Sequence, residues 1–188
     1  LWYRLRWLGD KKQTTTKLMD QNRCLYFDNG GYYTQDSKPL GVFHAGSYDI
    51  RKRHTDPLFN GFVYKGNGGL FDITNEYSNF RDTSMEFVFQ SGPYFTPDTV
   101  LKIRSDDSAR RIIIAKTKEG SFYFLAFIDT LNSYSGPYLA HLPQLLKQLP
   151  LEIAAAINLD GGSASAFYSQ EGVRLGEFTP VGSFLCGS

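Results

Sequence analysis

An apolar run that ends in Asp160-Gly161-Gly162 is the feature that most limits how this chain can fold. Residues 153–159 are short, mostly apolar and follow a helix-like segment ending at Pro150, so they predict a buried strand. The two glycines permit a sharp turn and leave backbone N–H groups that an anion can approach. Asp160 would then stand at the strand's end, where sites in α/β folds gather. A second interpretation stays open, because Asp-Gly is also a common hairpin turn.

The rest of the chain predicts many short strands and one clear helix. Leucines repeat at helical spacing between Leu139 and Leu149, with Pro143 near the first turn and Pro150 at the end. Residues 14–22 are compatible with a loop or a short helix. Strands are expected at residues 1–7, 24–27, 40–43, 61–64, 85–89, 111–115, 122–128 and 153–159. The pattern predicts an α+β fold, with residues 1–188 forming a single domain whose large twisted mixed β-sheet is partly covered by helices.

Composition narrows the possible partners. The chain has 188 residues, of which 41% are hydrophobic and 15% aromatic, as in a globular domain. Its 20 basic and 19 acidic residues give a net charge of +1, whereas a nucleic-acid partner normally requires a larger basic excess. No apolar segment approaches the eighteen or so residues of a transmembrane helix. The chain begins at Leu1 without a signal-peptide pattern, so we expect a processed or truncated form.

Four segments carry a resemblance to a known family. They are Asn29-Gly30-Gly31, Gln90-Ser91-Gly92-Pro93, Arg110-Arg111 and Asn158-Leu159-Asp160-Gly161-Gly162-Ser163, in this order. Together they resemble the phosphodiester glycosidase family, over about residues 25–185. The resemblance implies a hydrolase that cleaves the glycosidic bond of a sugar-1-phosphodiester and releases free sugar and a phosphomonoester. A sugar-phosphate or polysaccharide substrate and a periplasmic or secreted location are implied in the same way.

The chemistry of such a reaction favours one carboxylate and one arginine. A phosphate leaving group departs with little proton donation, so the second carboxyl of ordinary glycosidases is less necessary. Asp160 is the candidate nucleophile or base for water, and the alternative is an Asp that caps its own turn. Arg111 or Arg110 would bind the phosphate. Neighbouring strand residues point to opposite faces, so only one of the two is expected in the site.

The remaining candidates are polar or small residues near the same motifs. Substrate-binding roles are predicted for Asn29, Gly30, Gly31, Gln90, Ser91, Gly92, Asn158, Gly161, Gly162, Ser163 and Ser165. Turn formation is the competing interpretation for the Asn-Gly segment. Two other functions also fit these motifs: a non-catalytic module that binds phosphorylated or acidic polysaccharide, and a phosphodiesterase that cuts the P–O bond.

No cofactor is predicted. The sequence lacks C-x-x-C, H-x-x-x-H and G-x-G-x-x-G patterns, so it indicates neither a metal cluster nor a nicotinamide or flavin site. A divalent cation that bridges Asp160 and a phosphate stays open. Cys24 and Cys186 lie near opposite ends of the chain and predict either a disulfide or two buried thiols.

Overall fold

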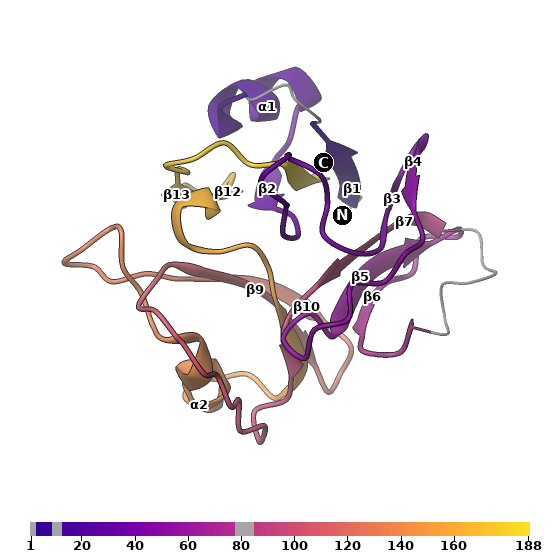
Figure 1. The fold of residues 1–188 in the computed structure, drawn as a ribbon. Coiled ribbons are helices and arrows are strands. Elements are labelled where there is room, and N and C mark those ends of the chain that lie inside the picture. Colours follow the sequence, from indigo (N-terminus) through magenta and orange to yellow (C-terminus); the bar gives the residue numbers. More distant parts are fainter. Residues whose placement is uncertain (1–2, 9–12, 78–84) are drawn as a thin grey trace.

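The fold is built from antiparallel β-sheets. A computed structural model describes residues 3–8, 13–77 and 85–188, and every strand pairing in these residues is antiparallel. The first sheet has the order β1-β14-β2-β12-β13 and lies at the top of Figure 1. Its strands are β1 (Tyr3–Trp7), β14 (Ser183–Gly187), β2 (Tyr26–Asn29), β12 (Phe167–Ser169) and β13 (Arg174–Leu175).

Two further sheets complete the described architecture. The second has the order β10-β9-β11-β8 and the third β4-β3-β7-β5-β6. The second sheet consists of β10 (Phe122–Phe127), β9 (Arg111–Thr117), β11 (Ile153–Asn158) and β8 (Tyr94–Phe95). The third consists of β4 (Tyr48–Ile50), β3 (Phe43–Ala45), β7 (Met85–Ser91), β5 (Gly61–Gly66) and β6 (Phe71–Thr74).

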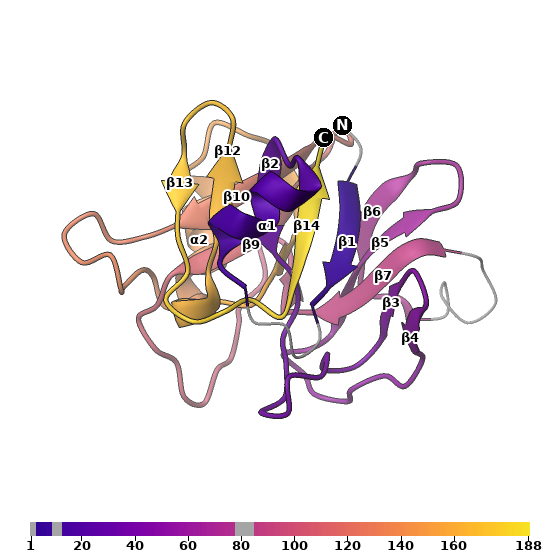
Figure 2. The same cartoon turned by 90° about the horizontal axis from the view of Figure 1, so that it is seen from above.

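Helices cover little of these sheets. Helix α1 (Thr15–Asn22) lies over the first sheet, as Figure 2 shows from above. The predicted leucine helix is present as a 3₁₀ turn, η2 (Leu139–His141), followed by α2 (Leu142–Lys147), and it packs on the second sheet. A short 3₁₀ turn, η3 (Gly162–Ala164), follows Asp160. None of the described helices is long and apolar enough to cross a membrane.

The α+β class is therefore broadly confirmed, while the single large mixed sheet is wrong. Parallel pairing needs a long crossover connection, usually through a helix. This chain instead joins β5 to β6 and β9 to β10 through short turns, which produce antiparallel hairpins. Predicted strand 153–159 is confirmed as β11, with Leu159 buried beyond its end. The expected strands at 24–27 and 40–43 start later, at Tyr26 and Phe43.

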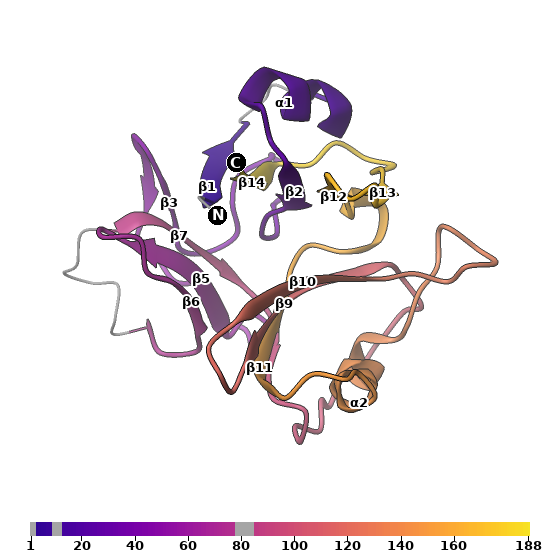
Figure 3. The ribbon, with the colours of Figure 1, turned by 180° about the vertical axis from the view of Figure 1, so that it is seen from behind.

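Burial on both faces explains why residues 112–115 of β9 are all apolar. Ile112 and Ile114 face a core shared by all three sheets, whereas Ile113 and Ala115 face the leucines of α2. All four side chains are fully buried. A strand covered on both faces carries no polar alternation. Figure 3 shows this second sheet between the first sheet and α2.

The two cysteines form a disulfide. Cys24, just before β2, is bonded to Cys186 in β14, and their Cα atoms lie 5.3 Å apart. The bond joins positions 162 residues apart in the sequence. Of the two alternatives left open by the sequence, the structure has the disulfide. It adds a covalent link beside the β2–β14 hydrogen bonds, where Phe27 pairs with Cys186.

Candidate active site

The register of β9 and β11 brings Asp160 beside Arg111. Asn158, at the end of β11, pairs with Ile113 near the start of β9, and the N–H of Leu159 continues the ladder by donating to the carbonyl of Ile112 at 2.9 Å. Antiparallel strands place the end of one beside the start of the other. The residue after Leu159 and the residue before Ile112 therefore lie at the same edge of the sheet.

Asp160 is a partly buried carboxyl, and its side chain makes one hydrogen bond to the residues that the structure describes. Its Oδ1 accepts the N–H of Gly161 at 3.0 Å. Burial disfavours the charged form and raises the pKa of Asp160 to about 7, although the bond from Gly161 acts in the opposite direction. A carboxyl with this pKa exchanges its proton near neutral pH, as a general base or acid requires. The bond to Gly161 also makes Asp160 the cap of its own turn, so the turn-capping interpretation is observed, while the catalytic role of Asp160 stays a prediction.

Arg111 faces the same cavity and is held by three acceptors. Its Nε donates to the carbonyl of Pro137 at 3.3 Å, and its Nη2 donates to the carbonyl of Asp107 at 2.6 Å and to Oδ1 of Asp106 at 3.3 Å. Its Nη1 would lie 3.7 Å from a Cβ placed on Gly161. No hydrogen bond of this Nη1 is found within residues 3–8, 13–77 and 85–188. Arg111 therefore presents a fixed N–H group to a cavity of about 310 Å³ that Asp160 also lines.

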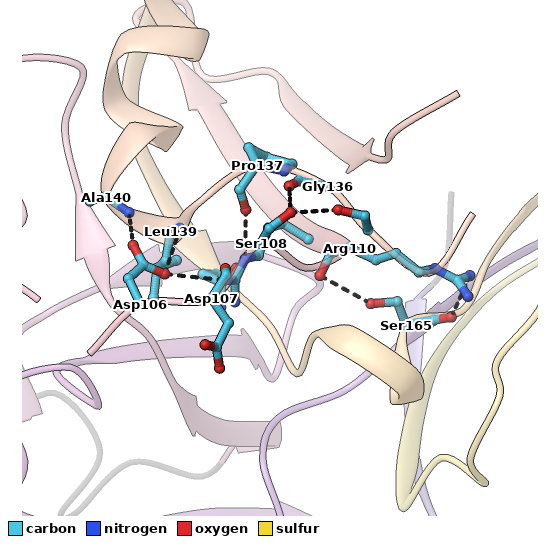
Figure 4. A network of polar contacts seen from close by, with 12 residues as sticks. Asp106, Asp107, Ser108, Arg110, Gly136, Pro137, Leu139, Ala140 and Ser165 are labelled. Carbon is cyan, nitrogen blue, oxygen red and sulfur yellow. Dashed lines mark hydrogen bonds and ion pairs between the residues drawn. The ribbon is translucent and has the colours of Figure 1, made fainter. Parts of the chain in front are cut away.

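Arg110 points away from this cavity. Its side chain is 1% exposed, and its Nη2 donates to the carbonyls of Ser165 and Gly176 at 3.1 and 2.6 Å. Its guanidinium carbon also lies 4.5 Å from the centre of the Phe178 ring. Figure 4 shows Arg110 extending toward Ser165, on the other side from Asp106. Of the two arginines, Arg111 lines the cavity with Asp160 and Arg110 does not; phosphate binding by Arg111 stays a prediction.

Two of the predicted amide residues fix the position of the Asp160 turn. Asn29 Nδ2 donates to the carbonyl of Asp160 at 2.7 Å, and its Oδ1 accepts the N–H of Ala166 at 3.0 Å. Asn158 Nδ2 donates to the hydroxyl of Tyr32 at 2.5 Å and to the carbonyl of Leu159 at 2.7 Å. Both amides are fully buried. They hold the ends of β2 and β11 together instead of lining the cavity.

Gln90 and Ser91 are also bonded within the fold. Gln90 Oε1 accepts the N–H groups of Val42 and His54 at 3.2 and 2.9 Å, and its Nε2 donates to the His54 carbonyl at 2.8 Å. Ser91 Oγ donates to the carbonyl of Asn158 at 2.7 Å. Both side chains are buried, so direct substrate contact by Gln90 and Ser91 is not supported by this geometry.

The predicted glycines serve close backbone packing more than anion binding. A Cβ on Gly30 would lie 2.0 Å from Ser183 Oγ, on Gly31 2.7 Å from the Gln90 carbonyl, and on Gly92 2.2 Å from the Leu58 carbonyl. The N–H of Gly161 donates to Asp160 and that of Gly162 to the Arg110 carbonyl. These N–H groups are engaged by the protein itself, so the uncovered N–H groups expected at the Gly161-Gly162 pair are not present. Gly162 also has a φ of +62°, which favours glycine.

The two predicted serines, Ser163 and Ser165, lie in different environments. Ser163 is exposed at a second cavity of about 420 Å³, where its Oγ lies 2.9 Å from Thr179 Oγ1. Ser165 is fully buried, and its carbonyl accepts the bond from Arg110. Asp160 and Gly161 line both this cavity and the one that contains Arg111. The carboxyl therefore lies where the two cavities meet.

Several lining residues were missed by the sequence reasoning. Tyr32 lines the Arg111 cavity, and burial raises the pKa of its phenol above the usual value, with the charge of Asp160 acting in the same direction. Tyr33 and Thr179 line the second cavity. Asp106 accepts a bond from Arg111. It also accepts the N–H groups of Leu139 and Ala140 at 3.0 and 2.8 Å, two contacts that are drawn in Figure 4. The only sequence signal was that Tyr32 and Tyr33 directly follow the Asn-Gly-Gly motif.

Within the described part of the chain, no group of three or more His, Cys, Asp or Glu side chains is placed to hold a metal ion. Asp160 and Asp106 both line the Arg111 cavity, but Asp106 is already bonded to Arg111 and to two backbone N–H groups. Asp107, whose carbonyl accepts from Arg111, is exposed at the same cavity.

The four motifs lie in order along this three-sheet fold, and a comparison with family models identifies the class of protein. The family model described as phosphodiester glycosidase matches residues 23–184, so the chain belongs to this family. No curated protein matches the chain in a sequence comparison.

Two solved structures share the fold. One is the catalytic domain of zebrafish N-acetylglucosamine-1-phosphodiester alpha-N-acetylglucosaminidase, auto-inhibited by its pro-peptide; it has a TM-score of 0.69 and 15% identity, covering 98% of this chain and 72% of that chain. The other is a hypothetical protein from Synechocystis, with a TM-score of 0.58 and 13% identity, covering 98% of this chain and 56% of that one. At these identities the similarity establishes the fold alone.

Proposed function

We propose that this chain hydrolyses the glycosidic bond of a sugar-1-phosphodiester and releases free sugar and a phosphomonoester. The observation that supports it is the shared cavity of Asp160 and Arg111, with Nη1 of Arg111 directed to Gly161, the residue after the carboxyl. Family membership over residues 23–184 supports the same class of reaction.

In this proposal Arg111 binds the phosphate. Its guanidinium is held by Pro137, Asp107 and Asp106, so little conformational entropy is lost when an anion arrives. Arginine binds phosphate oxygens directionally through its N–H groups. As the bond to the anomeric carbon breaks, charge grows on the phosphate oxygens, and a fixed N–H group stabilises that charge more than it stabilises the ground state.

Asp160 acts at the anomeric carbon. When ionised, it either attacks this carbon directly, forming a glycosyl ester that water then hydrolyses to free sugar and the regenerated carboxylate, or removes a proton from a water that attacks the carbon. The bond from carbon to the phosphate oxygen breaks, and its electron pair leaves with the phosphomonoester. The leaving group needs little protonation, so one carboxylate is sufficient for this reaction. The stereochemistry of the product distinguishes the two routes, since direct attack retains and water attack inverts the configuration.

The position of Asp160 between two cavities gives the substrate an orientation. The phosphate would occupy the Arg111 side. The sugar would occupy the other cavity of about 420 Å³, whose lining carries the hydroxyl side chains of Thr34, Ser37, Ser163 and Thr179. Hydroxyl groups suit a ligand rich in hydroxyls, because each can both donate and accept a hydrogen bond. A polysaccharide substrate would extend outward from this second cavity.

We also propose an extracytoplasmic location. The Cys24–Cys186 disulfide supports it, because disulfides persist mainly in oxidising compartments. The proposal includes no resident cofactor and no nucleic-acid partner. A divalent cation bridging Asp160 and the phosphate is tested below with a chelator.

The test is incubation with an N-acetylglucosamine-1-phosphate diester, with free sugar and phosphomonoester measured separately. The variants are Asp160→Asn and, as a matched control, Asp98→Asn, an exposed carboxyl paired with Lys147. Free sugar from the wild type and the control but not from Asp160→Asn supports the proposal. Loss of activity with chelator, restored by added Mg²⁺ or Ca²⁺, would show a bridging cation.

Two outcomes would overturn the proposed hydrolysis of the glycosidic bond. Sugar phosphate as the product would show a phosphodiesterase that cuts the P–O bond. Tight binding of phosphorylated or acidic polysaccharide without turnover of any sugar phosphodiester would show a binding module instead.

A further inference from the structure

A cavity on another side of the molecule contains a carboxyl that the proposed reaction does not use. It has a volume of about 380 Å³ and lies between β12 and the edge strand β10. Aromatic side chains dominate its lining, namely Tyr26, Phe122, Tyr123, Phe124, Phe167 and Tyr168. Asp28 lines it as well.

Asp28 occupies a position that the fold would ordinarily fill with an apolar residue. It lies in β2, a central strand of the first sheet, and its side chain is 2% exposed. Its partners in the register are Phe167 and Leu185, and directly paired residues point to the same face. Leu185 belongs to the core shared by the three sheets, and Phe167 packs against it.

One oxygen of the Asp28 carboxyl is buried and has no partner among the described residues. Its Oδ1 is buried without a hydrogen bond, and no ion pair involves this side chain. Buried polar groups are nearly always satisfied, so an unsatisfied carboxyl requires an explanation. Burial raises the pKa of Asp28 well above its usual range, which is the direction expected of a carboxyl that lacks a counter-ion.

The acidic and aromatic side chains around the cavity indicate the sign of the charge that its ligand carries. Among the described residues, its lining contains two carboxyl groups, those of Asp28 and Glu171, and no Lys, Arg or His. Glu171 is exposed and accepts the Tyr26 hydroxyl at 2.5 Å. Aromatic faces attract cations through their quadrupole, and this attraction increases when water is excluded. An anionic ligand would meet two acidic side chains here and no cationic side chain in the lining.

We propose that this cavity binds a protonated amine, with the ammonium group against Asp28 and the ligand's ring or chain against the aromatic side chains. The volume accommodates a six-membered ring. An amino sugar and an apolar amine share this chemistry, and the probes below distinguish them. The proposal is independent of the proposed function, because Asp28 and Asn29 are neighbours on one strand and point to opposite faces; Asn29 supports the Asp160 turn.

The experiment measures binding of matched pairs of small probes by calorimetry and by NMR of the protein. The pairs are cyclohexylamine with cyclohexanol and glucosamine with glucose; in each pair the amine replaces one hydroxyl. At least one amine is expected to bind about tenfold more tightly than its neutral partner, with shifts at Phe122 and Phe167. Tighter binding of glucosamine identifies an amino sugar, and tighter binding of cyclohexylamine identifies an apolar amine.

Two variants complete the test. Asp28→Asn, nearly identical in shape, should abolish the preference for the amine, whereas Glu171→Gln should keep most of it. Asp160→Asn should bind the amines as the wild type does, so failure of the proposed reaction would leave this result standing. Equal binding of amine and neutral partner, absence of binding by any probe, or an unchanged preference in Asp28→Asn would each overturn the proposal. If Asp28→Asn does not fold, the comparison of amine and neutral probes on the wild type still tests whether the cavity prefers a protonated amine.

Discussion

The side-chain amide of Asn29 donates a 2.7 Å hydrogen bond to the carbonyl of Asp160, from a position 131 residues earlier in the chain. Through this bond, the end of β2 in one sheet fixes the turn that follows β11 in another. The backbone of Asp160 is held on its other side too, because its N–H donates to the Gly30 carbonyl at 3.2 Å.

Asn29→Ala should therefore affect catalysis and stability together. Loss of the buried hydrogen bonds is expected to cost about 1–3 kcal/mol in the free energy of unfolding. Misplacement of the carboxyl should lower kcat about tenfold or more, with a smaller change in KM because the amide does not line the cavity. Gln90→Ala, also a buried amide, is the control and should lose stability while keeping kcat. Equal kcat for Asn29→Ala and the wild type would show a purely structural role.

The rate should depend on pH through Asp160. Burial raises its pKa to about 7, and the proposed reaction uses the ionised form. Below this pH the carboxyl is protonated and inactive, so kcat/KM should rise about tenfold per pH unit and level off above neutrality. A profile of kcat/KM against pH measures this directly. A rate that falls with rising pH across neutrality would instead assign Asp160 the role of an acid.

The raised pKa of Asp160 also predicts how the stability of Asp160→Asn differs from that of the wild type at each pH. A carboxyl whose pKa is higher in the folded state binds more protons when folded, so the fold loses stability as pH rises from its unfolded pKa, about 4, toward 7. The asparagine variant lacks this loss. Its melting temperature should exceed that of the wild type by the largest margin above pH 7, and the margin should shrink toward pH 4. Thermal melts of both proteins at several pH values test the sign.

Lysine substitutions should separate the two neighbouring arginines. Arg111→Lys should lower kcat/KM by about a hundredfold, because lysine cannot reproduce the fixed N–H geometry beside Gly161, and should also lose stability through the bonds to Pro137, Asp107 and Asp106. Arg110→Lys should lower the free energy of unfolding by about 2–4 kcal/mol, since a buried charge would lose hydrogen bonds and its contact with Phe178. Kinetics and urea melts on both variants provide the comparison. A reversed pattern would assign phosphate binding to Arg110.

Removal of the disulfide should destabilise the fold without changing the site. The double variant Cys24→Ser, Cys186→Ser lacks a link that closes most of the chain into a loop, and such links contribute about 2–5 kcal/mol. Urea melts give the loss in free energy of unfolding for the variant. This loss should equal the one that reductant causes in the wild type. The kcat of folded protein should stay unchanged, because the bond lies on the α1 side of the first sheet.

The sequence predicted those strands and helices that depend on residues close together in the chain. Residues 153–159 are an apolar strand followed by a turn in the structure, and the leucines after residue 138 are helical because proline starts and ends that segment. The pairing of β1 with β14, which joins the two ends of the chain, has no local signature. The division into three sheets therefore required the structure.

The site was predictable in part for the same reason. Asp160 and one arginine follow from their motifs and from the alternation of a strand. The roles of Asn29 and Gln90 do not, because an amide that binds a ligand and an amide that bonds distant backbone look alike in a sequence. Asp106 was missed since its partners, Arg111 and the start of η2, come together only when β9 and α2 pack.

The pairing of the first and last strands makes the chain nearly circular. Tyr3 in β1 lies opposite Gly187 in β14, and Figure 2 shows these two strands side by side. A chain that joins these ends with a short linker and opens at the exposed turn residues 67–69 would break no strand pairing within the three sheets. Only the hairpin connection of β5 and β6 would be lost, so such a circular permutant should fold with Asp160 and Arg111 in place.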